Sequence, residues 1–219
     1  MSPDDRRPVG LLGGSFDPIH IGHVQLARDA LRSLDLARVL FVPAGQAWQK
    51  GPAAAGGHRA RMIELAIGAE PRFALDRREL ERPGPSYTVD TLRELRAELG
   101  ANRPLVLLIG ADQFERLDTW HCWQQLIGLA HLGVATRPGS ERPLAPALAS
   151  LRALHAGTAA DVALRPAGIV APIAMQPVDC SSTRIRELLR EAPPEAGAAL
   201  ARLLAPAVLA YIRQHRLYC

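Results

Sequence analysis

Two histidines near the N-terminus, His20 and His23, are the residues of this chain best suited to chemistry. They lie three positions apart with Gly22 between them, directly after the run Gly13-Gly14-Ser15-Phe16-Asp17-Pro18. Residues at i and i+3 share one face of a helix, so both imidazoles can contact the same anion from a first helical turn. A helix N-terminus adds free N–H groups and a partial positive charge, which favour phosphate. The stretch therefore predicts a phosphate-binding turn.

Other interpretations of the two histidines are a metal-binding pair and plain helix capping. The metal interpretation is the weaker one, because no glutamate or third ligand stands at the spacing that H-E-x-x-H sites use. The chain also has no G-x-G-x-x-G after its first apolar run and no G-x-x-x-x-G-K-[ST] at any position. The common dinucleotide fingerprint and the P-loop are therefore both absent.

A second polar group stands near the other end of the chain. Ser181 and Ser182 occupy the place of a helix N-cap, and Thr183 and Arg186 follow in the expected first turns. Hydroxyls, amides and a guanidinium gathered at a helix start suit phosphate oxygens. The only lysine among the 26 basic residues, Lys50, stands in a polar loop after a strand and offers a compact, rotatable charge for a phosphate.

These residues need elements to position them, and the hydrophobic pattern predicts alternating strands and helices. The expected strands are 9–12, 38–42, 72–75, 104–109, 131–136 and 169–175. The expected helices are about 21–34, 58–69, 89–99, 183–190, 196–204 and 206–214, with a short helical region in 117–129. The helix 58–69 carries Met62, Leu65 and Ala66 at helical spacing, and no element is assigned to 140–168. This order favours an α/β, doubly wound fold with a mostly parallel sheet.

The bulk properties narrow the classes of protein. A length of 219 residues with 48% apolar residues suits one globular domain, 1–219, with a C-terminal helical part from about 180. The net charge of +4 suits an anionic ligand, but the charges are scattered, so we expect no nucleic-acid partner. Three cysteines without C-x-x-C spacing and the lack of a leader predict a cytoplasmic protein, and no apolar run is long enough to span a membrane. The oligomeric state does not follow from the sequence.

The two polar groups together resemble the signatures of a known family. Gly-Gly-Ser-Phe-Asp-Pro-Ile-His-x-Gly-His resembles the first signature of the HxGH nucleotidyltransferase superfamily, and Ser181-Ser182-Thr183-Arg184-Ile185-Arg186 resembles the second, usually written I-S-S-T-x-I-R. The two runs stand about 160 residues apart, at the first and last strand-to-helix junctions. The resemblance implies a Rossmann-like fold in which two helix N-termini bind one polyphosphate.

Within that superfamily the chain looks most like the bacterial nicotinate-nucleotide adenylyltransferases. The supporting runs are Pro85-Ser86-Tyr87-Thr88, Ile109-Gly110-Ala111-Asp112, Thr119-Trp120, Arg137-Pro138-Gly139, Tyr211-Ile212 and Leu217-Tyr218. The resemblance implies condensation of ATP with nicotinate mononucleotide to deamido-NAD (nicotinate adenine dinucleotide) and pyrophosphate, in NAD biosynthesis. It also implies Mg²⁺ that is bound with ATP, without dedicated protein ligands. Two departures are Ala47-Trp48-Gln49-Lys50 where the family often has P-P-H-K, so that only Lys50 carries over, and Cys180 in place of isoleucine.

The resemblance and the residue types together predict a role for each candidate site residue. The expected catalytic residues are His20, His23 and Arg186. The expected ATP-binding residues are Gly13, Gly14, Ser15, Phe16, Gly22, Lys50, Asp112, Arg137, Ser181, Ser182 and Thr183. The expected nicotinate mononucleotide-binding residues are Asp17, Lys50, Thr88 and Trp120. Trp120 offers a flat face to the pyridine ring, although Trp120 and Trp123 also suit a core, and Asp112 suits either ribose hydroxyls or a helix cap.

Two other functions fit part of the same pattern. One keeps the chemistry and changes the acceptor to nicotinamide mononucleotide or another phosphate ester. The other is a nucleotide sensor without catalysis. The complete pair of histidines and the complete Ser-Ser-Thr-x-Ile-Arg run argue against a sensor. Turnover requires phosphate-binding groups in both signatures, and the chain retains both sets.

Overall fold

The computed structural model describes residues 7–45, 54–68, 70–136, 143–175, 178–191, 193 and 195–218. The chain divides into two compact units. The first unit comprises Met1–Gly13, Leu26–Leu40 and Tyr87–Gln176, and the second comprises Gly14–Gln25, Phe41–Ser86 and Pro177–Cys219.

The strands form a six-stranded sheet of order β3-β2-β1-β4-β5-β6. They are β1 (Val9–Gly14), β2 (Arg38–Pro43), β3 (Phe73–Leu75), β4 (Leu105–Gly110), β5 (His131–Thr136) and β6 (Val170–Ala174). In the first unit β1, β4, β5 and β6 pair in parallel, with Val9 opposite Leu105 and Leu132 opposite Val170. The predicted α/β, doubly wound fold is confirmed, and each strand lies within two residues of its expected position.

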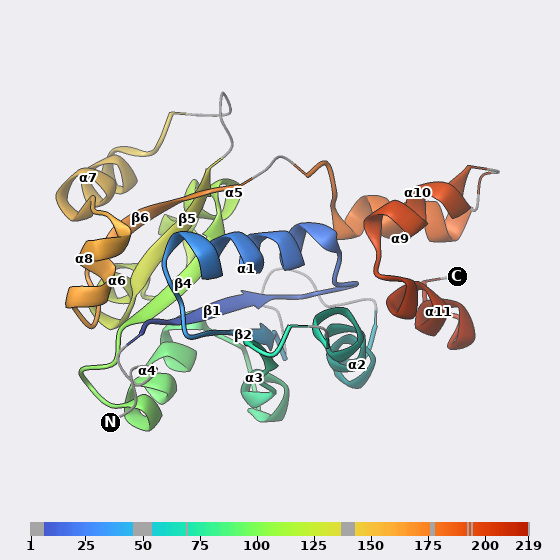
Figure 1. Ribbon diagram of the computed structural model, residues 1–219, viewed down its shortest axis with the longest axis horizontal. Coiled ribbons are helices and arrows are strands. Elements are labelled where there is room, and N and C mark those ends of the chain that lie inside the picture. The colour runs from blue at the N-terminus through green and yellow to red at the C-terminus, as the bar shows by residue number, and fades with distance from the viewer. Residues whose placement is uncertain are drawn as a thin grey trace. The chain divides into compact units, whose positions relative to one another are not determined.

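The first unit is built around β4, whose residues Leu105 to Ile109 are all buried. A strand with helices on both faces needs such a continuous apolar run, because neither face meets water. Helices α1 (Ile21–Ser33) and α4 (Thr88–Leu99) lie on opposite faces of the sheet (Figure 1). Helix α4 ends at Gly100, whose φ of 88° is rarely adopted by other residues.

The segment 140–168, for which the sequence predicts no element, contains two helices in its described part. They are α7 (Pro146–His155) and α8 (Ala159–Leu164). Helix α8 begins with a capping box, in which Asp161 accepts from the backbone N–H of Thr158 at 2.8 Å. Between β4 and β5 the first unit adds α5 (Ala111–Phe114), α6 (Leu126–Leu129) and the 3₁₀ turns Leu117–Thr119 and Trp123–Gln125.

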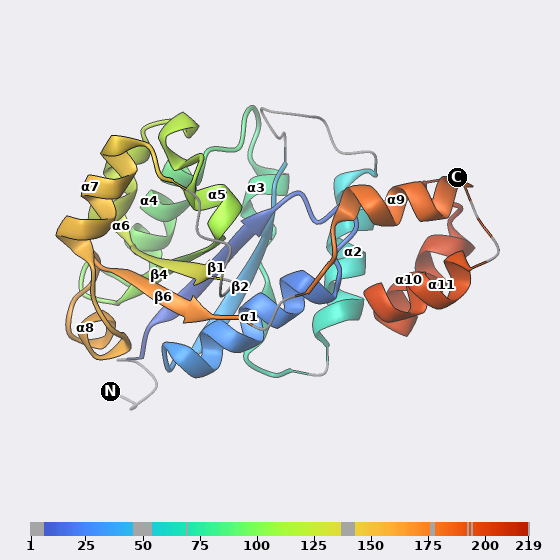
Figure 2. The same ribbon diagram turned by 90° about the horizontal axis from the view of Figure 1, so that it is seen from above.

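The second unit holds α2 (Gly56–Ile67), the short α3 (Arg78–Glu81), and the C-terminal helices α9 (Ser182–Glu191), α10 (Ala196–Leu203) and α11 (Pro206–Gln214). The three C-terminal helices lie side by side, and α11 packs on α2 (Figure 2). Of the three apolar residues at helical spacing in α2, Met62 is buried, and Leu65 and Ala66 are half-buried. The buried face also includes a charged residue, Arg59.

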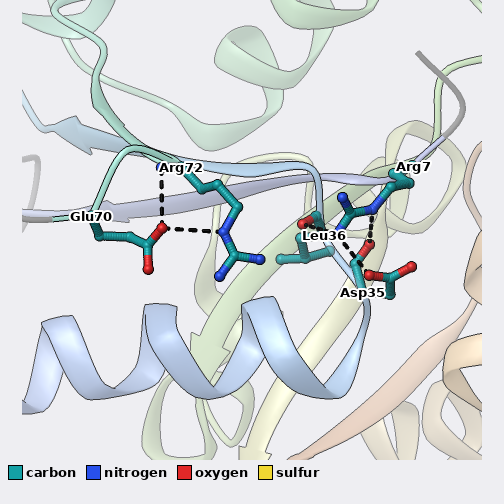
Figure 3. A network of polar contacts seen from close by, with 5 residues as sticks. All are labelled: Arg7, Asp35, Leu36, Glu70 and Arg72. Atoms are coloured by element: carbon teal, nitrogen blue, oxygen red, sulfur yellow. Dashed lines mark hydrogen bonds and ion pairs between the residues drawn. The ribbon is translucent and has the colours of Figure 1, made fainter. Parts of the chain in front are cut away.

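Polar contacts fix the chain near the ends of two elements. Beside β1, Arg7 donates to the Asp35 carboxylate at 2.7 Å and to the Leu36 carbonyl at 3.1 Å, which holds the turn after α1 (Figure 3). Before β3, Arg72 pairs with Glu70 at 3.1 Å (Figure 3). Across the described residues, no helix has the length and apolar character needed to cross a membrane.

Candidate active site

His20 and His23 lie against each other at the start of α1. Their rings are stacked, with centroids 3.7 Å apart and planes at 29°. The backbone N–H of His20 donates to Nδ1 of His23 at 3.2 Å. A ring nitrogen that accepts carries no proton, so neutral His23 has its hydrogen on Nε2, where it can be donated to a ligand. The predicted pairing of the two imidazoles on one helical turn is confirmed.

Burial keeps both imidazoles uncharged near neutral pH. It lowers the pKa of His20 to about 4, and burial with the charge of His20 lowers the pKa of His23 well below its usual range. His20 is 8% exposed, and its Nδ1 has no hydrogen-bond partner in the described structure. A buried nitrogen without a partner costs about 1–3 kcal/mol, which a ligand at this position would relieve.

Gly22 explains the spacing of the two histidines. A Cβ added at Gly22 would lie 3.2 Å from two atoms of the His20 ring, closer than side-chain carbons normally approach. The glycine therefore leaves room for the ring of His20 to fold back onto His23. A side chain at this position would require that ring to shift by a few tenths of an ångström.

The loop of residues 14–19, here called the glycine loop, is held through its carbonyl groups. Ser15 O accepts from Arg59 at 2.8 Å, Asp17 O accepts from Arg186 at 2.7 Å, and Pro18 O accepts from Ser182 at 3.0 Å. In a planar trans peptide the C=O and the next N–H point in opposite directions. The N–H groups that follow Ser15 and Pro18 are therefore directed away from these donors, as a loop that binds anions requires.

Phe16 contributes to the loop through its packing. Its φ of 48° is in the left-handed region, which bulky residues seldom adopt. The side chain is fully buried, with its ring edge-on to His23 at 4.9 Å and tilted against Phe41 at 5.9 Å. Any contact of Phe16 with a ligand must therefore be made by its backbone.

The second signature meets the first in the structure, through the bonds of Ser182 and Arg186 to the glycine loop. Ser181 caps α9 by accepting from the N–H of Arg184 at 3.2 Å, as its sequence position predicts. The hydroxyl of Thr183 accepts from Arg186 at 3.4 Å. Ser181 and Thr183 are exposed, and Arg186 is half-buried.

Asp17 is bonded to the protein itself. Its side chain is 3% exposed, and Oδ1 accepts from the N–H of Ala54 at 3.2 Å and from the hydroxyl of Tyr218 at 2.7 Å. Burial and the bond to Asp17 raise the pKa of Tyr218 far above its usual range. The sequence does not predict that Tyr218 donates to Asp17 or that Arg59 donates to Ser15 O. For Arg59, helical spacing could have indicated burial, because it stands three residues before Met62 on the buried face of α2.

Three further predicted residues, Thr88, Asp112 and Trp120, belong to the first unit. Thr88 is the first residue of α4, as predicted for a residue that offers a hydroxyl and free amides. Asp112, in the first turn of α5, is exposed and accepts from Gln113 at 3.0 Å. Trp120 is half-buried, so its ring is not enclosed in the core. Nearby in the chain, His121 stacks on Tyr87 at 4.3 Å, a pair that the sequence did not indicate.

Two predicted residues, Lys50 and Arg137, lie outside the described residues. Gly13 and Ser15 are exposed, and Gly14 is half-buried. The described part of the chain holds no group of three or more His, Cys, Asp or Glu side chains that could bind a metal ion.

A doubly wound sheet is typical of nucleotide-binding proteins, and here the chain that follows its first strand carries a stacked histidine pair at the start of α1. The sequence pattern of the cytidylyltransferase-like family matches residues 11–188. The fold is similar to that of the Plasmodium falciparum nicotinic acid mononucleotide adenylyltransferase complexed with NaAD, with a TM-score of 0.73, 18% identity and 97% of each chain covered. The same enzyme complexed with APC gives a TM-score of 0.71, 18% identity and the same coverage.

Relatives of higher sequence identity show to which family the chain belongs. A probable nicotinate-nucleotide adenylyltransferase of Chromobacterium violaceum is 45% identical over 213 residues, which covers 96% of this chain and 98% of that protein. The corresponding protein of Laribacter hongkongensis is 45% identical over 216 residues, covering 97% and 95%. The chain belongs to the nicotinate-nucleotide adenylyltransferase family of cytidylyltransferase-like proteins. The resemblance inferred from the two signatures is thereby confirmed.

Proposed function

We propose that this protein transfers the adenylyl group of ATP to nicotinate mononucleotide, forming nicotinate adenine dinucleotide and pyrophosphate in NAD biosynthesis. The relatives that share almost its whole length carry the name of this activity. The observation in the structure that carries the proposal is the stacked, uncharged pair His20 and His23 beside a loop whose carbonyl groups are turned toward protein donors.

The reaction needs positioning and charge stabilisation more than proton transfer. A phosphate oxygen of the mononucleotide attacks the α-phosphorus of ATP and expels pyrophosphate. Because the attacking phosphate is already ionised near neutral pH, no general base is required. Donors that are fixed where negative charge develops then provide most of the rate enhancement.

His23 is the residue best placed to be such a donor. Its Nδ1 is engaged by the backbone of His20, so its Nε2–H is held in one orientation. We assign this N–H to an oxygen of the α-phosphate, and the buried Nδ1 of His20 to a second contact with ATP. Arg186 keeps further N–H groups beside its bond to Asp17, and we assign these to the departing pyrophosphate.

The remaining assignments follow the sequence prediction and are proposals. Gly13, Gly14, Ser15, Gly22, Ser181 and Thr183 bind ATP phosphates through amides and hydroxyls, with Lys50 supplying a further charge, and Asp112 and Arg137 bind the nucleoside. Thr88 and Trp120 bind the nicotinate ring. The whole chain, 1–219, acts as one nucleotidyltransferase domain with its C-terminal helices completing the ATP site, and we expect it in the cytoplasm.

Mg²⁺ fits this chemistry as an ion that arrives with ATP. Enzymes that bind nucleotide phosphates often hold Mg²⁺ mainly through those phosphates and water. Besides the Asp17 carboxylate, which is bonded to Ala54 and Tyr218, the side chains described around the two histidines include imidazoles, hydroxyls and guanidinium groups, which suit phosphate oxygens better than they suit Mg²⁺. When bound, the ion would neutralise charge on the phosphates.

A pyrophosphate-release assay tests the proposal. The purified protein is given ATP and Mg²⁺ with either nicotinate mononucleotide or nicotinamide mononucleotide, and the dinucleotide product is identified by chromatography. We expect the acid to react more than about tenfold faster, because a hydrogen bond to a charged group contributes about 1.5–3 kcal/mol. A protein lacking both histidines controls for contaminating activity. Release with neither acceptor would exclude the enzyme, and a preference for the amide would exclude nicotinate as the acceptor.

A further inference from the structure

We propose that Arg59 is a positioning residue for adenylyl transfer, which fixes the peptide between Ser15 and Phe16 with its N–H toward the ATP phosphates. The inference rests on the proposed function and deepens it, because it concerns the loop that we assign to ATP. Arg59 itself does not touch the substrate in this proposal.

The contacts of Arg59 bring three segments of the second unit together. Its side chain is 1% exposed and comes from the first turn of α2. Nη1 donates to Ser15 O at 2.8 Å, Nη2 donates to Ala44 O at 2.7 Å, and Nε donates to Ala54 O at 3.1 Å. A guanidinium can serve three separate carbonyl groups because its donors have a fixed planar arrangement.

The bond to Ser15 O determines which way one peptide of the glycine loop faces. If that peptide turned over, a carbonyl oxygen would replace the N–H of Phe16 and would repel an anion. Phe16 already has a positive φ of 48°, so local backbone preference does not hold the peptide in place. The burial of its ring and the hydrogen bond from Arg59 are the contacts that do.

A buried guanidinium is costly unless it is compensated, so its presence needs a reason. Burial lowers the pKa of Arg59, and the negative charge of Asp17 opposes that effect. Asp17 is bonded to Ala54 and Tyr218. The Arg59 side chain and the Asp17 carboxylate therefore hold the glycine loop from both sides of Phe16.

Two substitutions separate positioning from stability. Arg59→Lys keeps the positive charge, but a single ammonium cannot span the three carbonyls, and Arg59→Met removes the charge as well. The matched controls are Arg61→Lys and Arg61→Met. Arg61 lies two residues further along α2, is 54% exposed and pairs with Glu64 at 3.0 Å. Thermal unfolding of each variant defines a temperature at which it is fully folded, and kinetics are measured there.

At that temperature we expect Arg59→Lys to lower kcat/KM for ATP by about 10- to 100-fold, the size of effect that small misplacements produce. The KM for nicotinate mononucleotide should stay within about twofold of the wild-type value, and both Arg61 variants should behave as wild type, since an exposed pair contributes little. A residue with a purely structural role would lower the unfolding temperature and leave the kinetics of the folded protein unchanged. A folded Arg59→Lys variant with wild-type kcat/KM for ATP would therefore overturn the proposal.

A measurement on the wild-type protein covers the case in which Arg59 variants do not fold. In ¹⁵N-labelled protein titrated with ATP and Mg²⁺, the amide signal of Phe16 should shift on binding, and the Nε–H signal of Arg59 should stay in slow exchange. ATP binding without a shift at Phe16 would also refute the inference. This experiment needs no turnover, so its outcome is independent of the pyrophosphate-release assay.

Discussion

Replacement of His23 by asparagine separates the two hydrogen bonds that its ring makes available. The Nδ1 atom accepts from the backbone N–H of His20 at 3.2 Å. An asparagine Oδ1 occupies nearly the same place along the side chain and also accepts, so His23→Asn keeps this bond. The Nε2–H has no counterpart in asparagine. Of the two hydrogen bonds, the variant therefore removes only the one from Nε2, which we assign to the α-phosphate, and it also loses the ring contacts with His20 and Phe16.

The two effects have different sizes. Loss of one fixed donor to a developing negative charge typically lowers kcat by about 10²–10³, or about 2.7–4 kcal/mol. Loss of the bond to His20 leaves a backbone N–H without its partner, at a cost to folding of about 1–3 kcal/mol. His23→Asn should therefore lose most of its kcat at a smaller cost in stability than His23→Ala, which loses both hydrogen bonds. Neither variant keeps the edge-on contact with Phe16 at 4.9 Å, so the loss of this contact is common to both.

The assay is pyrophosphate release at saturating ATP and nicotinate mononucleotide, together with urea unfolding of wild type, His23→Asn and His23→Ala. His23→Gln is the complementary control, because its Nε2 can donate but its side chain does not place an acceptor at the Nδ1 position. It should retain more activity than His23→Asn and less stability. The assignment would be refuted by a His23→Asn protein with kcat within about fivefold of wild type, since that is far less than a lost phosphate donor costs.

Two further predictions concern stability. The pKa values of His20, His23 and His131 are lowered by burial, so the unfolded chain binds protons more readily than the native protein does. Stability should therefore fall as the pH falls through about 6.5, by at most about 1.4 kcal/mol per pH unit for each such group. An unfolding temperature unchanged between pH 7 and 5 would contradict this. Tyr218→Phe removes a bond of 2.7 Å to a carboxylate and should lower the free energy of unfolding by about 1.5–3 kcal/mol. Tyr211→Phe, which removes a bond of 2.9 Å to His58, should cost less, and equal losses in urea unfolding would argue against a charged partner at Tyr218.

The sequence predicted the elements whose pattern is local. The run of β4 is apolar without interruption because both of its faces are covered, and that pattern identifies a buried strand directly. The helix starts at Thr88 and Ser182 follow from nearby residues in the same way. The two signatures could also be found from the sequence, because each is a short continuous run next to the start of one helix.

The parts that the sequence did not predict depend on contacts between distant segments. Tyr218 reaches Asp17 across 201 positions, and no local pattern marks either residue as the partner of the other. Apolar spacing in α2 groups Leu65 and Ala66 with Met62, but it says nothing of Arg59. Arg59 is buried in this helix, although arginine is usually an exposed residue.

The structure also changes how the second signature is understood. Ser182 has one hydroxyl hydrogen, and it is donated to Pro18 O at 3.0 Å, so this serine cannot give that hydrogen to a phosphate while the bond lasts. Arg186 has more donors and can hold Asp17 O while it contacts a ligand. Residues that the sequence pattern groups as ligand contacts thus divide into those that shape the glycine loop and those with donors left for ATP. Arg59 lies outside both signatures and also contacts the glycine loop, through its hydrogen bond to Ser15 O, so the contacts that shape this loop are not confined to the two signatures.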